Sequence, residues 1–223
     1  MLYIVATPIG NLEDITLRAL KILNQVDGVI CEDSRRTSIL LNHFHINKHL
    51  FVLNDYNEAR NIPYLIDKLK KGENLSLVSD AGTPLISDPG YKLVREAIRQ
   101  NVPIDSLPGP SSLITALTLS GLPPDKFFFL GYLPEKPMAR VNTLKALIEI
   151  DKKLKSTFII FLPPHKLLKT FIEIKETLGD INLSLAKELT KLHQKIETKK
   201  ASLWIEDFTA TIPKGEFVCL FRI

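Results

Sequence analysis

The sequence predicts an α/β protein built of two α/β domains with a cleft between them. Three observations carry this prediction. Short apolar runs alternate with stretches of helical periodicity. The runs of the first half contain almost no polar residues, and the local composition changes near the middle of the chain. Apolar strands separated by helices are typical of a parallel sheet that is covered on both faces.

The first half contains five predicted strands, at 2–6, 28–33, 49–54, 74–80 and within 102–107. Helical periodicity follows the first strand, at 14–23, and recurs at 61–72, where Gly72 ends the helix. A further helix is expected to begin at Ser111 and to end before Gly121. Strand and helix therefore alternate, as in a parallel sheet.

The second half opens with "LPPDKFFFLGYLPEKPMAR" (122–140), a stretch rich in proline, aromatic and turn residues. New strand signals follow at 127–130, 157–162, 183–187 and 217–221, with helical stretches at 140–154 and 165–178. We therefore expect an N-terminal α/β domain at 1–114 and a C-terminal α/β domain at 115–223.

Composition and charge exclude several classes of protein. The 223 residues carry a net charge of +4, which favours anionic partners mildly, and a run of lysines near 187–200 is expected to form a solvated face. Cys31 and Cys219 have no paired spacing, and three histidines at 43–49 lack a helper carboxylate, so neither a disulfide framework nor a metal site is predicted. No signal peptide and no membrane span is recognisable, so we expect a cytoplasmic protein without a membrane partner.

Three loops each follow a predicted strand and precede a helix: "ATPIGN", "SDAGTPLISDPG" (79–90) and "PGPSS". In open α/β sheets this edge binds ligands, beside helix N-termini that favour anions. Glycine lets a ligand approach the backbone, and aspartate accepts hydrogen bonds. The loops therefore predict a ligand site. A structural connection, in which Asp80 and Asp88 cap turns, is the alternative interpretation.

The same loops disfavour several common chemistries. "TPIGN" lacks the Gly-Lys-Ser/Thr ending of a phosphate loop, and no two-glycine dinucleotide fingerprint follows any strand. The Gly-x-Ser-x-Gly nucleophile motif is absent, and no histidine is placed to activate Ser111 or Ser112. Their hydroxyl and N–H groups are better suited to hold a carboxylate at the start of a helix.

Taken together, "VATPIGNLEDITLRAL", "LVSDAGTPLISDPGYKLV" and "PGPSSLITALTLSGLP" strongly resemble the ribosomal RNA small-subunit methyltransferases that modify a cytidine 2′-hydroxyl, a branch of the tetrapyrrole methylase superfamily. Four further strings follow in the family's order: "EDSRRT" (32–37), "FFLGYLPEK" (128–136), "PHKLL" (164–168) and "KELTKLH" (187–193). The resemblance covers nearly the whole chain.

The resemblance implies two α/β domains, S-adenosylmethionine (SAM) in the cleft between them, and a homodimer. By similarity, loop residues of the first half would bind SAM: Thr7, Pro8, Gly10, Asp80, Ala81, Gly82, Thr83, Pro84, Ser111 and Ser112. The adenosine side would come from the second half: Leu162, Pro163, Ala186, Glu188, Leu189 and Thr190.

Methyl transfer to a ribose hydroxyl needs alignment of the reactants and removal of a proton by a general base. Glu32, Asp33 and Asp80 are the candidate bases, and we favour Asp33. Four cations would contact RNA phosphates: Arg35, Arg36, Arg140 and Lys166. For "EDSRRT" a salt-bridged helix start with Asp33 as N-cap is the alternative, and Arg140 could equally be an exposed helix residue.

The chain departs from the family pattern at several places. It has "NDYNE" (54–58) where a His-Glu-His-Asn-Glu run is usual, and "FLPPHK" (161–166) where Tyr-Glu-Ser-Pro-His-Arg is usual. Ser34 stands in place of threonine, and the C-terminal helical extension of many relatives is not present. The sequence predicts a SAM-dependent 2′-O-ribose methyltransferase whose partner is ribosomal RNA or the small ribosomal subunit. A tetrapyrrole methylase and a non-catalytic SAM- or RNA-binding factor are the alternatives.

Overall fold

The computed structural model describes residues 1–211 and 213–223. The chain forms two compact units, Met1–Ser111 and Ser112–Ile223. A division after residue 114, as expected from the sequence, would cut the helix Ser112–Ser120, which the structure assigns whole to the second unit.

The first unit is built on a five-stranded sheet in the order β3-β2-β4-β1-β5, with every neighbouring pair parallel. Its strands are β1 (Leu2–Val5), β2 (Gly28–Cys31), β3 (His49–Val52), β4 (Leu75–Val78) and β5 (Ile104–Leu107). All five were predicted. The second strand ends two residues earlier than expected, because Asp33 already caps the following helix.

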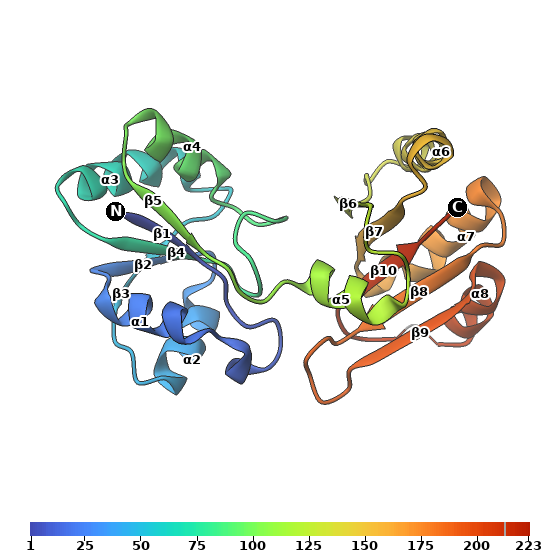
Figure 1. Ribbon diagram of the computed structural model, residues 1–223, viewed down its shortest axis with the longest axis horizontal. Helices are drawn as coiled ribbons and strands as arrows, with labels where there is room; N and C mark the ends of the chain where they lie inside the picture. Colours follow the sequence, from blue (N-terminus) through green and yellow to red (C-terminus); the bar gives the residue numbers. More distant parts are fainter. Residues whose placement is uncertain (212) are drawn as a thin grey trace. The chain divides into compact units, whose positions relative to one another are not determined.

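Helices cover both faces of this sheet. They are α1 (Leu17–Gln25), α2 (Ser34–His43), α3 (Glu58–Lys70) and α4 (Tyr91–Arg99), with a short 3-10 turn η1 (Leu12–Asp14) before α1. Figure 1 shows α1 and α2 on one face and α3 and α4 on the other. Adjacent strand residues therefore enter different cores, as Val29 and Ile30 do, which explains why the strands are apolar throughout.

The second unit has a mixed five-stranded sheet in the order β6-β7-β10-β8-β9. The strands are β6 (Phe127–Tyr132), β7 (Thr157–Leu162), β8 (Asn182–Lys187), β9 (Lys195–Lys200) and β10 (Phe217–Phe221). β6 pairs with β7 in parallel, and the other pairs are antiparallel. The strand predictions at 157–162 and 217–221 match β7 and β10.

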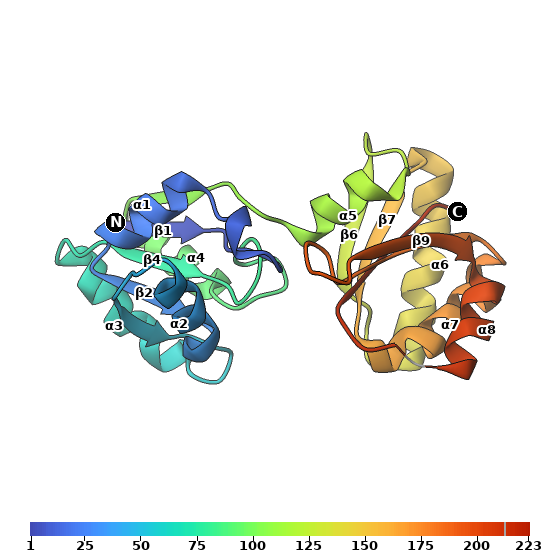
Figure 2. The same ribbon diagram turned by 90° about the horizontal axis from the view of Figure 1, so that it is seen from below.

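Helices lie on both faces of the second sheet (Figure 2). The first face carries α6 (Pro137–Leu154), α7 (Leu167–Leu178) and α8 (Ala201–Ala210), over a core that includes Phe158, Phe171 and Trp204. A 3-10 turn, η2 (Pro164–Lys166), precedes α7. On the other face, α5 (Ser112–Ser120) contacts β10, β8 and β9.

Sequence reasoning missed β9 and α8. The strand contains three lysines, at 195, 199 and 200, and lies at the edge of the sheet. Lysines on an edge strand discourage pairing with another chain, and they also hide the strand pattern. Lys199 lies over the ring of Trp204, 4.6 Å from its centroid, so part of the expected solvated face packs against α8.

None of the helices in the described residues has the length and apolar character needed to cross a membrane. Both cysteines are free and buried.

Candidate functional site

The loops after β1 and β4 are joined by main-chain hydrogen bonds. The Thr7 N–H donates to the Gly82 carbonyl at 2.9 Å, and the Gly82 N–H donates to the Thr7 carbonyl at 3.0 Å. The Thr7 hydroxyl also donates to the Ser79 carbonyl at 3.1 Å. Two stretches that lie more than 70 residues apart in sequence are thus fixed to each other at the carboxyl edge of the sheet.

The loop after β5 joins the same arrangement. The Thr83 hydroxyl donates to the Pro110 carbonyl at 3.0 Å. Gly82 has a φ of +88°, and a Cβ there would lie 3.2 Å from Ile9 Cγ2. Glycine is therefore required at this position by conformation and is tightly surrounded. The three loops that the sequence analysis selected do meet at one edge of the first unit.

The far end of the 79–90 loop is held by Glu58. Leu85 and Ser87 adopt positive φ angles of 74° and 66°, and Gly90 adopts 111°. The Glu58 carboxylate is buried, accepts a hydrogen bond from the Gly90 N–H at 3.1 Å, and pairs with Lys92 at 2.9 Å. Positive φ angles persist in non-glycine residues only where the surroundings determine them. Glu58 fixes the end of this loop at Gly90.

Asp33 is the N-cap of α2. Its carboxylate accepts from the Arg35 backbone N–H at 2.9 Å and from the Arg35 guanidinium at 2.6 and 3.0 Å. These hydrogen bonds lower the pKa of Asp33 to about 2. The capped, salt-bridged helix start that the sequence allowed is therefore present, and it makes the favoured base a weak proton acceptor.

Three further carboxylates lie at the same edge. The Asp80 carboxylate accepts from the Asp33 N–H at 3.2 Å and lies 3.5 Å from Arg36 Nε. Burial raises the pKa of Glu32, and the charge of Asp80 adds to the effect. Burial, with the charges of Glu32 and Asp80, raises the pKa of Asp88 to about 6. These mutual effects place Glu32, Asp80 and Asp88 close together.

Asp88 is the carboxylate that sequence reasoning did not select. Its position in a Ser-Asp-Pro-Gly turn before a helix favoured a capping role. Asp88 could have been selected because it lies in the same loop as Asp80, after the carboxyl end of the same strand.

The residues of the first unit that the resemblance assigned to the cofactor lie in the three joined loops. Thr7, Pro8, Gly82 and Pro84 are buried, whereas Gly10 and Ala81 are exposed. Ser111 is the last residue of the first unit, and Ser112 begins α5 in the second.

In the second unit, the side chains of Leu162 and Ala186 point to opposite faces of the sheet. Phe161, Val218 and Ala186 lie in one row across the strands, and Leu162 lies in the next row. Leu162 belongs to the core beneath α6, α7 and α8. The two side chains therefore face different sides of the sheet, and nothing in the sequence signalled the register that separates them.

The loop from 188 to 190 follows β8, with positive φ angles of 49° at Glu188 and 61° at Thr190, and Leu189 is buried. The Glu188 carboxylate accepts from the Glu216 N–H at 2.8 Å and from Lys191 Nζ at 3.1 Å. These contacts lower its pKa. In this structure the Glu188 side chain shapes the loop, and Pro163 begins the turn after β7.

The four cations assigned to RNA have different surroundings. The side chains of Arg35 and Arg36 are 88% and 59% exposed. Lys166 pairs with Glu135. Arg140 requires a correction, because it is only 5% exposed.

The Arg140 guanidinium makes four hydrogen bonds, all of them to residues of the second unit. It donates to both carboxylate oxygens of Glu173, at 2.5 and 2.6 Å, and to the carbonyls of Pro134 and Glu135, at 2.9 and 2.8 Å. The residue anchors the β6–α6 loop and is not available to a phosphate. Helical spacing could have indicated that Arg140 is buried, because it lies on the same face of α6 as the buried Leu144 and Leu147.

Comparison with known proteins decides the family. The family model described as Tetrapyrrole (Corrin/Porphyrin) Methylases matches residues 1–203. The chain belongs to the tetrapyrrole methylase family. The resemblance found in the sequence is confirmed, and so is the predicted α/β fold class.

Several members of the tetrapyrrole methylase family are close in sequence. The "Ribosomal RNA small subunit methyltransferase I" of Thermotoga maritima is 45% identical over 215 residues, covering 96% of this chain and 95% of the relative. The enzyme of the same name from Escherichia coli is 48% identical over 223 residues, covering 98% of this chain and 76% of the relative. The chain is therefore a methyltransferase of this family.

Two solved structures share the fold at low identity. A crystal structure of diphthine synthase has a TM-score of 0.78 at 16% identity, covering 99% of this chain and 88% of that one. The cobalt precorrin-4 methyltransferase has a TM-score of 0.73 at 19% identity, covering 99% of this chain and 94% of that one. At these identities the likeness concerns the tetrapyrrole methylase fold alone.

The departure at "NDYNE" falls at three positions that are not buried, of which Asn54 is half-buried and accepts hydrogen bonds from the Tyr56 and Asn57 N–H groups. Asn57 donates to the Val52 carbonyl and accepts from the Asn54 N–H, and Glu58 holds Gly90. These two residues keep the Asn-Glu ending of the expected run. Asp55 and Tyr56 are exposed, Tyr56 fully so. The departure from the family pattern therefore leaves the hydrogen bond between Glu58 and the 79–90 loop intact.

Proposed function

We propose that this enzyme transfers the methyl group of SAM to the 2′-hydroxyl of a cytidine in small-subunit ribosomal RNA. The observation that carries the proposal is the identity of 45% and 48%, over nearly the whole chain, with two enzymes whose names specify that RNA. The joined loops at the carboxyl edge of the first sheet supply a site of the expected kind.

The chemistry of the donor set fits SAM, whose sulfonium and ammonium groups are cationic. Glu32, Asp80 and Asp88 lie together at the loop edge, and carboxylates attract such groups. We assign the cofactor to the loop residues named by the resemblance, with Ser111 and Ser112 at the start of α5 suited to a carboxylate. When bound, SAM supplies an activated methyl group.

The proton of the ribose hydroxyl must be accepted by a carboxylate of the protein. Asp33, Glu32 and Asp80 are the proposed bases, and their surroundings favour Glu32. Its pKa is raised, whereas Asp33 is held by Arg35. Asp88, whose pKa is raised to about 6, would itself stay protonated at acidic pH, so that the neighbouring carboxylates do not all carry a charge at once.

The exposed cations of α2 are the proposed phosphate contacts, and Lys166 is a third. Arg35 and Arg36 flank the carboxylates and would exchange their pairing with Asp33 and Asp80 for contacts with RNA. We further propose that the enzyme acts in the cytoplasm, on ribosomal RNA or the small subunit, as a homodimer.

The test is a methyl-transfer assay with methyl-labelled SAM. Small ribosomal subunits, naked small-subunit RNA and a porphyrinoid are offered separately, and the product is digested to nucleosides. We expect label in one cytidine, on a ribose that resists alkaline cleavage at its 3′ side. Label in the porphyrinoid, or SAM binding without transfer to any of the three, would overturn the proposal. Glu32→Gln should bind SAM and lose transfer.

A further inference from the structure

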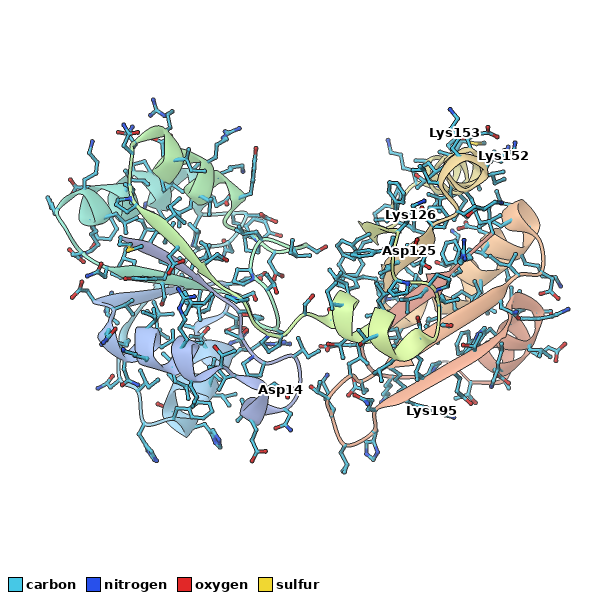
Figure 3. The ribbon with its side chains drawn as sticks, in the orientation of Figure 1. Asp14, Asp125, Lys126, Lys152, Lys153 and Lys195 are labelled. Carbon is cyan, nitrogen blue, oxygen red and sulfur yellow. The ribbon has the colours of Figure 1, made fainter. Side chains whose placement is uncertain are left out.

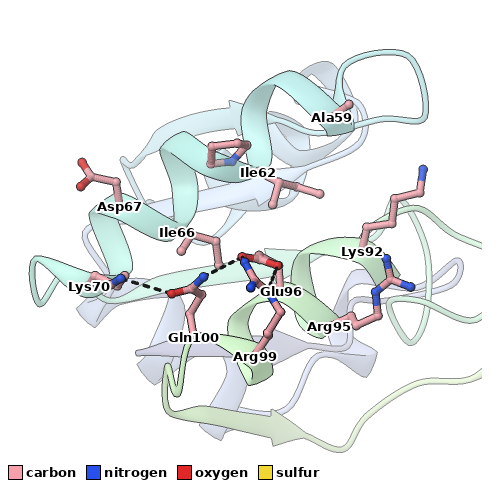
Figure 4. Close-up of a pocket in the computed structure, with 11 residues that line it drawn as sticks. Ala59, Ile62, Ile66, Asp67, Lys70, Lys92, Arg95, Glu96, Arg99 and Gln100 are labelled. Atoms are coloured by element: carbon pink, nitrogen blue, oxygen red, sulfur yellow. Dashed lines mark hydrogen bonds and ion pairs between the residues drawn. The ribbon is translucent and has the colours of Figure 1, made fainter.

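A groove of about 590 Å³ lies between α3 and α4 on the outer face of the first unit (Figure 4). Its apolar lining comes from Ile62, Pro63 and Ile66 of α3. Four cations and two carboxylates make up most of the charged rim, which α3 and α4 share. The groove thus combines an apolar floor with a charged rim.

The charges of the rim do not cancel. Arg99 pairs with Glu96 at 2.7 Å, and two rim residues pair outside the groove, Lys92 with Glu58 at 2.9 Å and Asp67 with Lys71 at 2.6 Å. Two cations remain in excess, Lys70 and Arg95. Neither forms an ion pair with a carboxylate in the part of the chain that the structure describes.

The two unpaired cations lie on different helices. Lys70 donates to Gln100 Oε1 at 3.2 Å, and the Gln100 amide in turn donates to Glu96 at 3.0 Å, as drawn in Figure 4. Arg95 lies over the ring of Tyr91, 5.6 Å from its centroid, and Tyr91 is 62% exposed. An exposed tyrosine beside a guanidinium offers a flat surface on which an unpaired base can stack.

The groove begins at the proposed active site. Glu58 opens α3 and binds the N–H of Gly90, where the 79–90 loop ends, and α4 starts at the next residue, Tyr91. Asp55, just before α3, is close enough to affect the pKa of both Glu32 and Lys92. A strand that leaves the site past Glu58 would therefore enter the groove along α3 and α4.

We propose that the α3–α4 groove binds the single-stranded RNA that flanks the modified nucleotide. The inference rests on the proposed function. The excess cations would neutralise phosphates, and the apolar floor with Tyr91 would take the faces of bases. A groove for an anion alone would not need the apolar floor, and one for an apolar peptide would not need unpaired cations.

The test uses the double variant Lys70→Gln/Arg95→Gln, because neither change disturbs Glu58. Binding to naked small-subunit RNA is measured by filter retention over a range of salt. Each lost phosphate contact reduces the slope of log K against log salt by about 0.7, so the double variant should lose about 1.4. Its affinity should fall by about 25-fold at roughly 0.1 M salt and recover toward wild type as salt rises.

The matched control is Lys152→Gln/Lys153→Gln, which removes the same charge from the exposed end of α6 (Figure 3). An equal loss in both doubles would show an effect of net charge and overturn the inference. So would an unchanged salt slope, or a loss seen only with assembled subunits, which would indicate a protein partner. Arg95→Lys should keep the slope and lose affinity if Tyr91 and Arg95 stack together.

The outcomes separate the inference from the proposed function. If the wild type does not methylate ribosomal RNA, the function fails. If the wild type methylates it and the double variant has the same KM for RNA, the groove assignment fails alone. We expect a raised KM with little change in kcat at saturating RNA, because neither Lys70 nor Arg95 is one of the proposed catalytic carboxylates.

Discussion

Replacement of Glu58 by alanine tests whether this buried carboxylate holds the 79–90 loop. The change removes the acceptor of the Gly90 N–H and the partner of Lys92. A main-chain hydrogen bond to a charged group is worth about 1.5–3 kcal/mol. The half-exposed ion pair adds less than about 1 kcal/mol. The free energy of unfolding should therefore fall by roughly 3 kcal/mol, and Tm by roughly 10 °C.

Calorimetric melting measures this loss, and amide hydrogen exchange locates it. Exchange should accelerate in 79–90 and at the start of α4 more than elsewhere, since these segments lose their restraint. Glu58→Gln keeps an oxygen that can accept from Gly90 and should cost only about 1 kcal/mol. SAM binding should weaken in the order wild type, glutamine, alanine.

The matched control is Glu149→Ala, which removes another glutamate paired with a lysine. Its partner is Lys152 at 2.7 Å, and its side chain is 66% exposed. An exposed pair of this kind contributes little to stability, so melting should barely change. If Glu58→Ala melts within about 2 °C of wild type, or loses no more than Glu149→Ala, Glu58 does not restrain the loop.

Three further substitutions probe other parts of the structure. Arg140→Ala leaves the buried Glu173 unpaired and should lower the free energy of unfolding by about 3–5 kcal/mol in urea denaturation; a loss typical of a surface arginine would contradict the buried pair. Gly82→Ala forces a side chain into positive φ and should cost about 1–2 kcal/mol and weaken SAM binding in calorimetry, whereas unchanged binding would remove the loop junction from the site. For Asp88, the pKa rises from 3.8 to about 6 on folding. Between these values the folded state keeps a proton that the unfolded state has released, so the free energy of unfolding should fall as pH rises through this window, by roughly 1–2 kcal/mol after allowing for solvent screening of the partly exposed carboxylate. Melting of Asp88→Asn should lack this pH dependence, and an unchanged profile would assign it to another group.

The sequence was sufficient for the parts of the fold that depend on periodicity. Strands such as β7 and β10 are continuous apolar runs bounded by turn residues, so their limits could be read directly. The limits of β9 could not be read in this way, because its lysines protect a sheet edge and interrupt the apolar pattern of a strand. The convergence of the three loops followed from the rule that parallel strands end at one edge of the sheet.

The roles of charged side chains were harder to predict, because pairing is decided by tertiary contacts. Arg140 and Glu58 are charged, yet each occupies a buried stripe of its helix, with Leu144 and Leu147 in α6 and with Ile62 in α3. A charge at such a position must be paired, since burial of an isolated charge is costly. Helical spacing could have shown that both residues are buried, but not which partner each would find.

The same difficulty applies to the prediction of which carboxylate accepts the proton. Asp33 and Arg35 are two residues apart at a helix start, and local geometry alone allowed the cap that lowers the pKa of Asp33. The pKa of Glu32 is raised first by burial and then by the charges of Asp80 and Asp55, which come from different strand ends. The charged form of Asp33 is stabilised by its neighbour Arg35, whereas that of Glu32 is disfavoured by burial and by carboxylates of other loops. The proposed choice of proton acceptor therefore depends on the junction of the loops rather than on the motif that contains both residues. Disrupting the Thr7–Gly82 bridge should therefore change the pH dependence of methyl transfer even though neither residue titrates.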